Sequence, residues 1–345
     1  MIPEALQKLV QGHSLTDAEA TAVAIAIMDG HATPAQIGAI LTALRMKGET
    51  VEEATAFAKA MRARVVPVHC QRKPLLDTCG TGGSTFRVFN VSTASAFVLA
   101  GAGIVVAKHG NRAMSGVCGS ADVLEALGVN LQLTPEQSAQ CIDTVGMGFL
   151  FAQQHHPAMK QVALPRREIG VRTLFNLLGP LTNPAGATQQ VMGVYDPALC
   201  SLAIGTLRAL GCERAIVLHG EVGLVEIATF GRTFYSELQN GQITEGVLTP
   251  EDFGLVGTPP SPEEIAPAPT AQENATLLRR TLSGAKETPA DLARRDLVAV
   301  NASAALRVAG QTTDWREGYE LALELIDSGK AQKTLQHLID FTRSL

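Results

Sequence analysis

The feature that most limits the fold is a change of pattern at Pro74. Upstream of it the chain reads as helices only, whereas downstream short apolar runs alternate with helical stretches. Alternation of this kind predicts an α/β domain in which helices cover the faces of a sheet. The expected strands are Leu75–Cys79, Ile104–Ala107, Val191–Tyr195 and Ala215–Leu218. The expected helices between them are Ser92–Leu99, Ala121–Leu127, Thr173–Leu178 and Leu202–Leu210.

The first part of the chain carries signals for helix starts. Thr16 with Glu19, and Thr50 with Glu53, form T-x-x-E capping boxes before apolar stretches. Short connections between such helices predict a compact bundle. We therefore expect a helical domain over residues 1–68 and an α/β domain over 72–345. The 345 residues, 46% of them apolar, suffice for a large core.

Composition argues against several classes of protein. The net charge of −5 and the absence of a dense basic run oppose nucleic-acid binding. No signal peptide is recognisable, and the apolar run 94–107 is too short to span a membrane. The six cysteines form no CxxC pair, so they predict reduced thiols in a cytoplasmic protein instead of a zinc site or a disulfide framework.

A glycine-rich turn after the first expected strand is a candidate phosphate cradle. Gly80, Gly82 and Gly83 would let backbone N–H groups approach an anion, and the helix that follows offers unpaired N–H groups at its positive end. The side chains of Asn90, Ser92 and Thr93 add donors at that helix start. Taken alone, the turn is equally compatible with a tight connection that binds nothing.

A second candidate follows the second expected strand, where ligands of α/β sheets usually bind. Lys108 could supply a point charge to a phosphate, while His109 and Asn111 could orient a polar aromatic ligand. The alternative is a turn with solvated Lys108 and Arg112.

Two further segments carry polar or turn-forming residues. Arg166 lies in a charged run that is also typical of a solvated helix face. Gly179 and Pro180 end a helical stretch, which is ordinary helix punctuation. The adjacent His155 and His156 do not predict a metal site, because neighbouring residues face different ways and no third ligand lies at metal spacing.

In combination and in this order, the motifs are specific. The chain resembles the anthranilate phosphoribosyltransferase family from about residue 4 to its end. The motifs that carry the resemblance are Gly80-Thr-Gly-Gly, Asn90-Val-Ser-Thr, Lys108-His-Gly-Asn-Arg, Gly119-Ser-Ala-Asp, Arg172-Thr-Leu-Phe-Asn-Leu-Leu-Gly-Pro-Leu-Thr-Asn-Pro and Leu248-Thr-Pro-Glu-Asp-Phe-Gly-Leu.

The resemblance implies a fold and a reaction. The fold is a small N-terminal helical domain, with a segment near 166–183 packing on it, and a larger α/β domain with a central, mostly parallel sheet, the class II phosphoribosyltransferase and nucleoside phosphorylase type. The reaction joins 5-phosphoribosyl 1-diphosphate (PRPP) to anthranilate, releases diphosphate, uses Mg²⁺ and belongs to tryptophan biosynthesis. The family implies a homodimer that meets through the helical domain, with no nucleic-acid or membrane partner.

The resemblance also assigns residues. No residue is expected to act as a nucleophile or general base, because an aromatic amine is already neutral and catalysis rests on positioning and charge stabilisation. Ser92 and Glu226 match positions linked to Mg²⁺. Acceptor positions match Gly80, His109, Asn111, Arg166, Gly179 and Pro180. Donor positions match Gly80, Gly82, Gly83, Thr85, Asn90, Ser92, Thr93, Lys108 and Ser120.

Three departures from the family pattern fall on the donor side. Ser84-Thr85 stands where the family usually has Asp-Gly, Val225-Glu226 where it has Asp-Glu, and Val117 where it has a lysine. Mg²⁺ needs oxygen ligands, and a valine side chain supplies none. A weakened metal site, a related transferase or phosphorylase with another donor or acceptor, and a non-catalytic homologue that binds a ligand or nucleic acid all stay open.

Overall fold

The computed structural model describes residues 1–113 and 116–345, and its N-terminal helices begin at the expected caps. Thr16 Oγ1 accepts a hydrogen bond from Glu19 N at 3.3 Å, and the Glu19 carboxylate accepts one from Thr16 N at 2.8 Å. Thr50 and Glu53 form the same reciprocal pair, at 3.2 and 2.9 Å. The helices of this part are α1 (Ile2–Val10), α2 (Asp17–Met28), α3 (Pro34–Lys47) and α4 (Val51–Arg62).

A seven-stranded sheet in the order β3-β2-β1-β4-β5-β6-β7 forms the centre of the molecule. The pairs from β3 to β5 are parallel, and the β5–β6 and β6–β7 pairs are antiparallel. The predicted fold, a small helical domain with a mostly parallel α/β domain, is therefore confirmed. The strands are β1 (Leu76–Asp77), β2 (Val106–Gly110), β3 (Met147–Phe151), β4 (Gln189–Gly193), β5 (Arg214–Gly220), β6 (Thr233–Gln239) and β7 (Gln242–Leu248).

Three strands were missing from the sequence prediction, namely β3, β6 and β7. The signal for the last two was present, because Asn240-Gly241 separates two runs rich in strand formers. Asn240 and Gly241 have φ angles of 51° and 75°, which is the left-handed pair that a two-residue hairpin turn requires.

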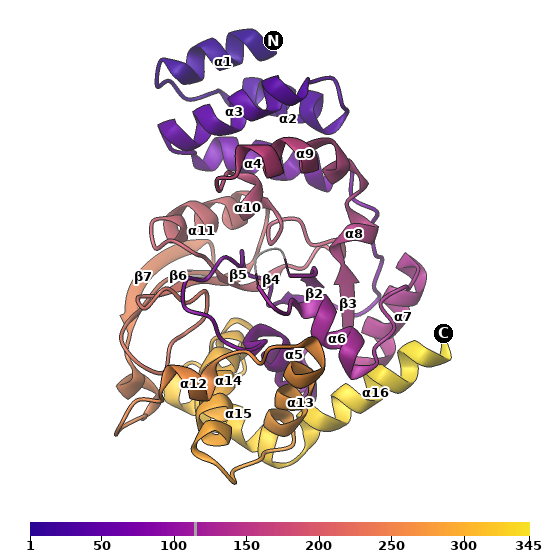
Figure 1. Cartoon of the computed structure of the whole chain (residues 1–345), viewed down its shortest axis with the longest axis vertical. Helices are drawn as coiled ribbons and strands as arrows, with labels where there is room; N and C mark the ends of the chain where they lie inside the picture. Colours follow the sequence, from indigo (N-terminus) through magenta and orange to yellow (C-terminus); the bar gives the residue numbers. More distant parts are fainter. Residues whose placement is uncertain (114–115) are drawn as a thin grey trace.

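Helices cover both faces of the sheet. One large core joins α5, α6 and the C-terminal helices to the sheet, and another joins the N-terminal helices and α11 to its opposite face. Figure 1 shows the N-terminal bundle at one end of the molecule and the C-terminal helices at the other. The α-helices that follow β1 in the chain are α5 (Val91–Gly101), α6 (Ser120–Leu127), α7 (Pro135–Val145), α8 (Ala152–His155), α9 (Lys160–Ile169), α10 (Phe175–Leu178), α11 (Leu199–Ala209), α12 (Pro262–Ile265), α13 (Ala271–Leu282), α14 (Pro289–Val308), α15 (Trp315–Asp327) and α16 (Lys330–Ser344).

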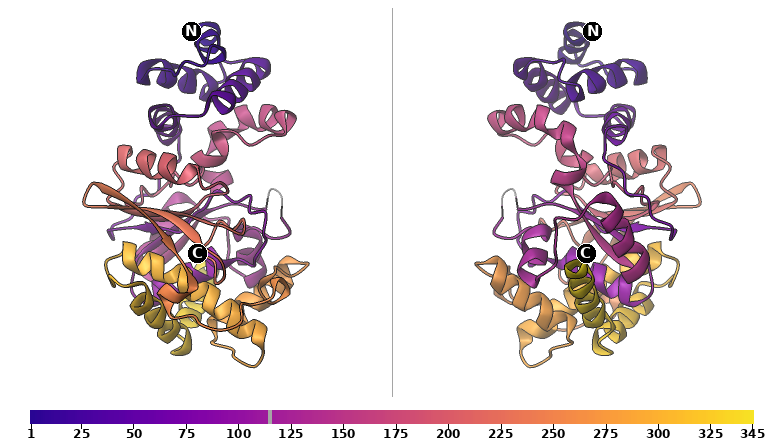
Figure 2. Two further views of the ribbon diagram at one scale, coloured as in Figure 1. Left: turned by 90° about the vertical axis from the view of Figure 1, so that its left-hand side faces the viewer. Right: turned by 90° about the vertical axis from the view of Figure 1, so that its right-hand side faces the viewer.

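The N-terminal bundle is joined to the rest of the chain through α9, α10 and α4. Helix α9 contacts α2 and α3, and α10 contacts α4, so the bundle includes a later part of the chain (Figure 2). Arg62 at the end of α4 donates from Nε to the Leu181 carbonyl at 2.8 Å and from Nη1 to the Leu210 carbonyl at 3.3 Å. Within the described residues, no helix has both the length and the apolar character needed to cross a membrane.

Candidate functional site

The glycine-rich turn that follows β1 has a backbone that only glycine adopts easily. Gly82 and Gly83 have φ angles of 63° and 79°. Gly80 lies so close to β4 that a Cβ atom there would be 2.9 Å from the Gly193 carbonyl oxygen. We call residues 80–85 the glycine loop. Its glycines are needed both for left-handed conformation and for close backbone packing.

Hydrogen bonds hold the two ends of the glycine loop. Thr81 N donates to Gly193 O at 2.9 Å, and Thr85 N donates to Gly223 O at 3.0 Å. Between these points, the amides of Gly82, Gly83 and Ser84 have no acceptor in the described part of the chain. Consecutive free amides in left-handed backbone form a typical anion-binding concavity.

The start of α5 adds polar groups next to the glycine loop. Asn90 is the N-cap residue but makes no side-chain cap hydrogen bond, and its Nδ2 donates to Cys118 O at 3.1 Å. The Thr93 hydroxyl is buried and has no partner in the described residues. The hydroxyl of Thr78, at the base of the loop, donates to Ser92 O at 3.0 Å. The loop and the positive end of α5 therefore lie side by side.

Lys108 lies beneath this cradle and is not solvated. It is 1% exposed, and its Nζ donates to Thr78 Oγ1 at 3.1 Å and to Ser92 Oγ at 3.4 Å. Burial lowers the pKa of Lys108, and the nearby Asp77 and Glu226 carboxylates oppose that shift. The alternative of a solvated Lys108 is therefore wrong, and its amino group lies at the floor of the loop.

Asp77 organises the protein interior behind the loop. Its carboxylate accepts from His109 N at 3.1 Å and from Asn183 Nδ2 at 2.7 Å. Burial raises the pKa of Asp77 to about 6, despite the opposing effect of Lys108. Ligand atoms of Asp77, Cys79 and His109 lie within 4.8 Å of one another. Because both Asp77 oxygens already accept protein hydrogen bonds, we interpret this cluster as structural.

Replacement of Asn183 by alanine is expected to destabilise the fold by about 2–3 kcal/mol. The change would leave the Asp77 carboxylate and the Ala107 carbonyl, which also accepts from Asn183 Nδ2, short of a donor in a buried place. Urea unfolding measures the effect, with the exposed Gln272→Ala as control. An unchanged midpoint for Asn183→Ala would contradict this account.

Two neutral histidines line the acceptor side. His109 Nδ1 lies 3.2 Å from Gly179 O, and His109 Nε2 lies 3.1 Å from His156 Nε2. Burial lowers the pKa of both rings, that of His156 to about 4. The Gly179 carbonyl can only accept, so Nδ1 of His109 carries the proton and His156 Nε2 donates to His109 Nε2. The other ring nitrogen of His156 has no partner in the described residues.

Arg166 is a partly buried cation rather than part of a solvated face. Its guanidinium carbon lies 5.6 Å from the centre of the Phe175 ring. Burial lowers the pKa of Arg166. Among the described residues no carboxylate lies within ion-pair distance of it. A desolvated guanidinium without a partner is suited to bind a ligand carboxylate in a fork.

The segment around Gly179 and Pro180 adjoins the start of the glycine loop. Gln190 Nε2 donates to Pro180 O at 2.8 Å and to Cys79 O at 3.5 Å. The structure therefore brings the start of the glycine loop, His109 and the Gly179–Pro180 segment to one edge of the sheet, beyond the carboxyl ends of β1, β2 and β4.

The outer rim of this region holds the remaining predicted residues. Ser120 Oγ donates to Asn111 O at 3.3 Å, and Asn111 is exposed. Thr85 is tied to Gly223 through its amide, and Val117 is exposed in the connection before α6. His155 and His156 have different partners. His155 Nδ1 lies 3.0 Å from Val66 O, whereas His156 Nε2 lies against His109.

One carboxylate remains beside Lys108. Glu226 Oε2 is buried without a partner in the described residues, and burial raises the pKa of this carboxyl to about 7, with Lys108 acting in the opposite sense. An orphaned carboxylate oxygen fits a Mg²⁺ ion that keeps several water ligands. The neighbouring Val225 offers no side-chain oxygen, so the residues present fit one ion better than two.

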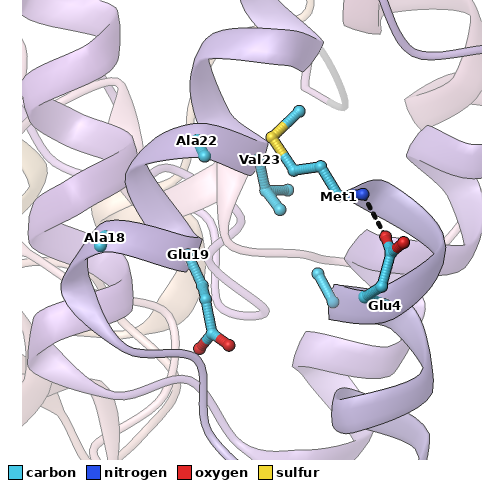
Figure 3. A pocket seen from close by; sticks show the side chains of 7 residues that line it. Met1, Glu4, Ala18, Glu19, Ala22 and Val23 are labelled. Atoms are coloured by element: carbon cyan, nitrogen blue, oxygen red, sulfur yellow. Dashed lines mark hydrogen bonds and ion pairs between the residues drawn. The ribbon is translucent and has the colours of Figure 1, made fainter.

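Sequence reasoning missed several residues of this region. Arg172 and Asn183 stood within the motif from Arg172 to Pro184 but received no role, and His156 was expected to belong to a structural or surface pair and not to line a binding site. Gln190, and Tyr195 after β4, gave no local signal. A hollow between α1 and α2, lined by Met1, Glu4, Ala5, Ala18, Glu19, Ala22 and Val23, contains none of the predicted site residues (Figure 3).

Comparisons with known proteins agree along the whole chain. Residues 3–65 match the helical bundle domain of a glycosyl transferase family, and residues 72–332 match its a/b domain. An anthranilate phosphoribosyltransferase of Desulforamulus reducens is 48% identical over 345 residues, covering 100% of this chain and 98% of that protein. One of Anaeromyxobacter is 50% identical over 343 residues, covering 99% of each.

Solved structures give the same result. The anthranilate phosphoribosyltransferase of Thermus thermophilus is 43% identical, with a TM-score of 0.90 over 98% of this chain and 99% of that one. The Saccharomyces cerevisiae enzyme in complex with PRPP and Mg is 26% identical, with a TM-score of 0.89 over 100% of this chain and 98% of that one.

Proposed function

Because this chain belongs to the anthranilate phosphoribosyltransferase family, we propose that it transfers the 5-phosphoribosyl group of PRPP to the amine of anthranilate. The product pair is the N-phosphoribosyl amine and diphosphate, and the step serves tryptophan biosynthesis. The single observation that carries the proposal is the juxtaposition of free glycine-loop amides with the acceptor-side segment at one sheet edge, through Gln190.

The donor is held by backbone groups on one side. Free amides of Gly82, Gly83 and Ser84 bind phosphate oxygens, and the positive end of α5 adds to their effect. The buried charge of Lys108 beneath the loop stabilises negative charge that develops on the departing diphosphate. The glycine loop, the start of α5 and Lys108 therefore stabilise the departing diphosphate more strongly than they stabilise intact PRPP.

The acceptor is held by the opposite side. Arg166 pairs with the anthranilate carboxylate, because its desolvated guanidinium lacks a protein carboxylate in the described residues. The amine needs no base before attack, since an aromatic amine is neutral at pH 7. His109 and His156 stay neutral and so add no positive charge beside a carbon that becomes cationic.

Glu226 and Ser92 would hold Mg²⁺. The ion, when bound, neutralises charge on the diphosphate. The orphaned Oε2 of Glu226 supports this assignment, whereas Val225 does not support a second ion beside it.

The test is a turnover assay with PRPP, anthranilate and a Mg²⁺ titration, followed through the loss of anthranilate fluorescence. Saturable turnover that requires both substrates is expected. Absence of turnover at every Mg²⁺ concentration, in a protein that melts cooperatively, would refute the proposal.

The free cysteines agree with a cytoplasmic site of action.

We further propose a homodimer that meets through the helical domain. Large apolar side chains are exposed there, with Val10 68% and Met46 83% exposed. A second copy would remove this apolar surface from water. Met46→Asp is expected to shift the protein from dimer to monomer in light scattering, while the equally charged change Val256→Asp, on an exposed loop of the other domain, leaves a dimer. A monomeric wild-type protein would contradict this proposal.

A further inference from the structure

Arg172, between α9 and α10, contacts the glycine loop directly. Its Nη2 donates to the Gly83 carbonyl at 2.6 Å. Its guanidinium also lies over the Tyr195 ring, with 4.2 Å between Cζ and the ring centre. A planar guanidinium can stack on an aromatic face and donate from its edge at the same time. Arg172 is therefore fixed between β4 and the loop.

The contact with Arg172 requires a residue without a side chain at position 83. A Cβ atom at Gly83 would lie 3.2 Å from the Arg172 guanidinium, tighter than ordinary packing, and the φ angle of 79° is unfavourable for any other residue. The guanidinium thus lies against the backbone of the loop itself.

The hydrogen bond to Gly83 O also fixes the next amide. In a trans peptide the C=O and N–H groups point in opposite directions. Because Gly83 O points toward Arg172, the Ser84 N–H points to the other side of the loop. The loop thus has three fixed points: Thr81 N on Gly193 O, Thr85 N on Gly223 O, and Gly83 O on Arg172.

The free amides lie between these fixed points. Those of Gly82, Gly83 and Ser84 have no acceptor within residues 1–113 and 116–345. Without Arg172 the peptide after Gly83 would lack its middle attachment and could rotate, because glycine tolerates many backbone angles. Holding donors in place before the ligand arrives lowers the entropy cost of binding.

We propose that Arg172, stacked on Tyr195, is a positioning residue for the phosphate groups of the donor, an inference that rests on the proposed phosphoribosyl transfer. Arg172 acts through the Gly83 peptide and does not itself touch the donor. Within the described residues it forms no ion pair, so its positive charge also favours an anion at the loop.

The experiment compares Arg172→Ala with Arg167→Ala, an exposed arginine of the same segment. Arg172→Ala is expected to raise the KM for PRPP about tenfold or more, because a charge-assisted hydrogen bond is lost. The KM for anthranilate and the Arg167→Ala control are expected to stay within about twofold of wild type. Calorimetry with PRPP and Mg²⁺ provides a readout that is independent of turnover and should give the same loss of affinity.

A second pair of variants tests the stacking. Tyr195→Phe keeps the ring and is expected to behave as wild type, whereas Tyr195→Leu removes the ring and should raise the KM for PRPP about threefold. If Arg172→Ala does not melt cooperatively, the two Tyr195 variants test the inference in its place. Equal PRPP affinities of Tyr195→Phe and Tyr195→Leu would then overturn it.

The outcomes separate this inference from the proposed function. An unchanged PRPP affinity in Arg172→Ala, or an equal rise of both KM values, overturns the positioning role. If wild type binds PRPP in the calorimeter but turns over no anthranilate, the proposed function fails, and the Arg172 comparison still reads out through PRPP affinity.

Discussion

Arg166→Ala is expected to raise the KM for anthranilate about a hundredfold, while the KM for PRPP changes little. The guanidinium is desolvated, lies over Phe175 and has no carboxylate partner in the described chain, so a ligand carboxylate is its natural counterion. A truncated side chain removes both hydrogen bonds of the fork and the charge. Steady-state kinetics with each substrate varied in turn measures the effect.

Two comparisons sharpen that experiment. Arg166→Lys keeps the charge but loses the planar fork, so an intermediate KM for anthranilate is expected. Aniline, which lacks the carboxylate, should be used equally poorly by wild type and Arg166→Ala. If aniline instead separates the two proteins as strongly as anthranilate does, Arg166 does not act through the carboxylate.

Glu226→Gln is expected to weaken divalent metal binding in the presence of PRPP by about 10–100-fold. Glu226 Oε2 is a buried carboxylate oxygen without a protein partner, and the amide has the same shape without the charge. Mn²⁺ titration followed by electron paramagnetic resonance measures the bound ion directly, independently of turnover. The variant should retain the wild-type melting temperature without metal. Equal Mn²⁺ affinity in both proteins would exclude Glu226 as a ligand.

A second variant tests the metal site in the opposite direction, by adding a possible metal ligand. Val225→Asp restores an oxygen ligand next to Glu226, at a partly exposed position. It is expected to raise the number of Mn²⁺ ions bound with PRPP from one to two per chain, because Val225 now supplies no oxygen. Two bound ions in the wild-type protein would show that other groups replace the missing carboxylate.

The sequence alone determined most of the fold. Capping boxes at Thr16 and Thr50 give a local signal, since each depends on residues three apart, and both helices begin where predicted. Short buried strands such as β1 and β5 were recognisable from apolar runs. Strand β3 was missed because an apolar run directly after a helix lacks its own periodicity, and β6 and β7 because polar residues such as Glu237 and Glu245 interrupt their apolar runs.

The candidate site was only partly predictable. Glycine-loop residues and Arg166 were found through motifs, which record residue types in order along the chain. The environment of each group was decided by tertiary structure: Lys108 is buried beneath the loop, and Arg166 lies over Phe175 without a counterion in the described residues.

The motifs of the sequence alone identified the glycine loop and the helix start that follows it. They could do so because backbone conformation and helix starts depend on neighbouring residues. Only the folded chain placed Arg172 between Gly83 and the Tyr195 ring, and Gln190 between Cys79 and Pro180. These partners are far apart in sequence, and burial, pKa shifts and unpaired donors arise from such long-range contacts, so no local pattern encodes them.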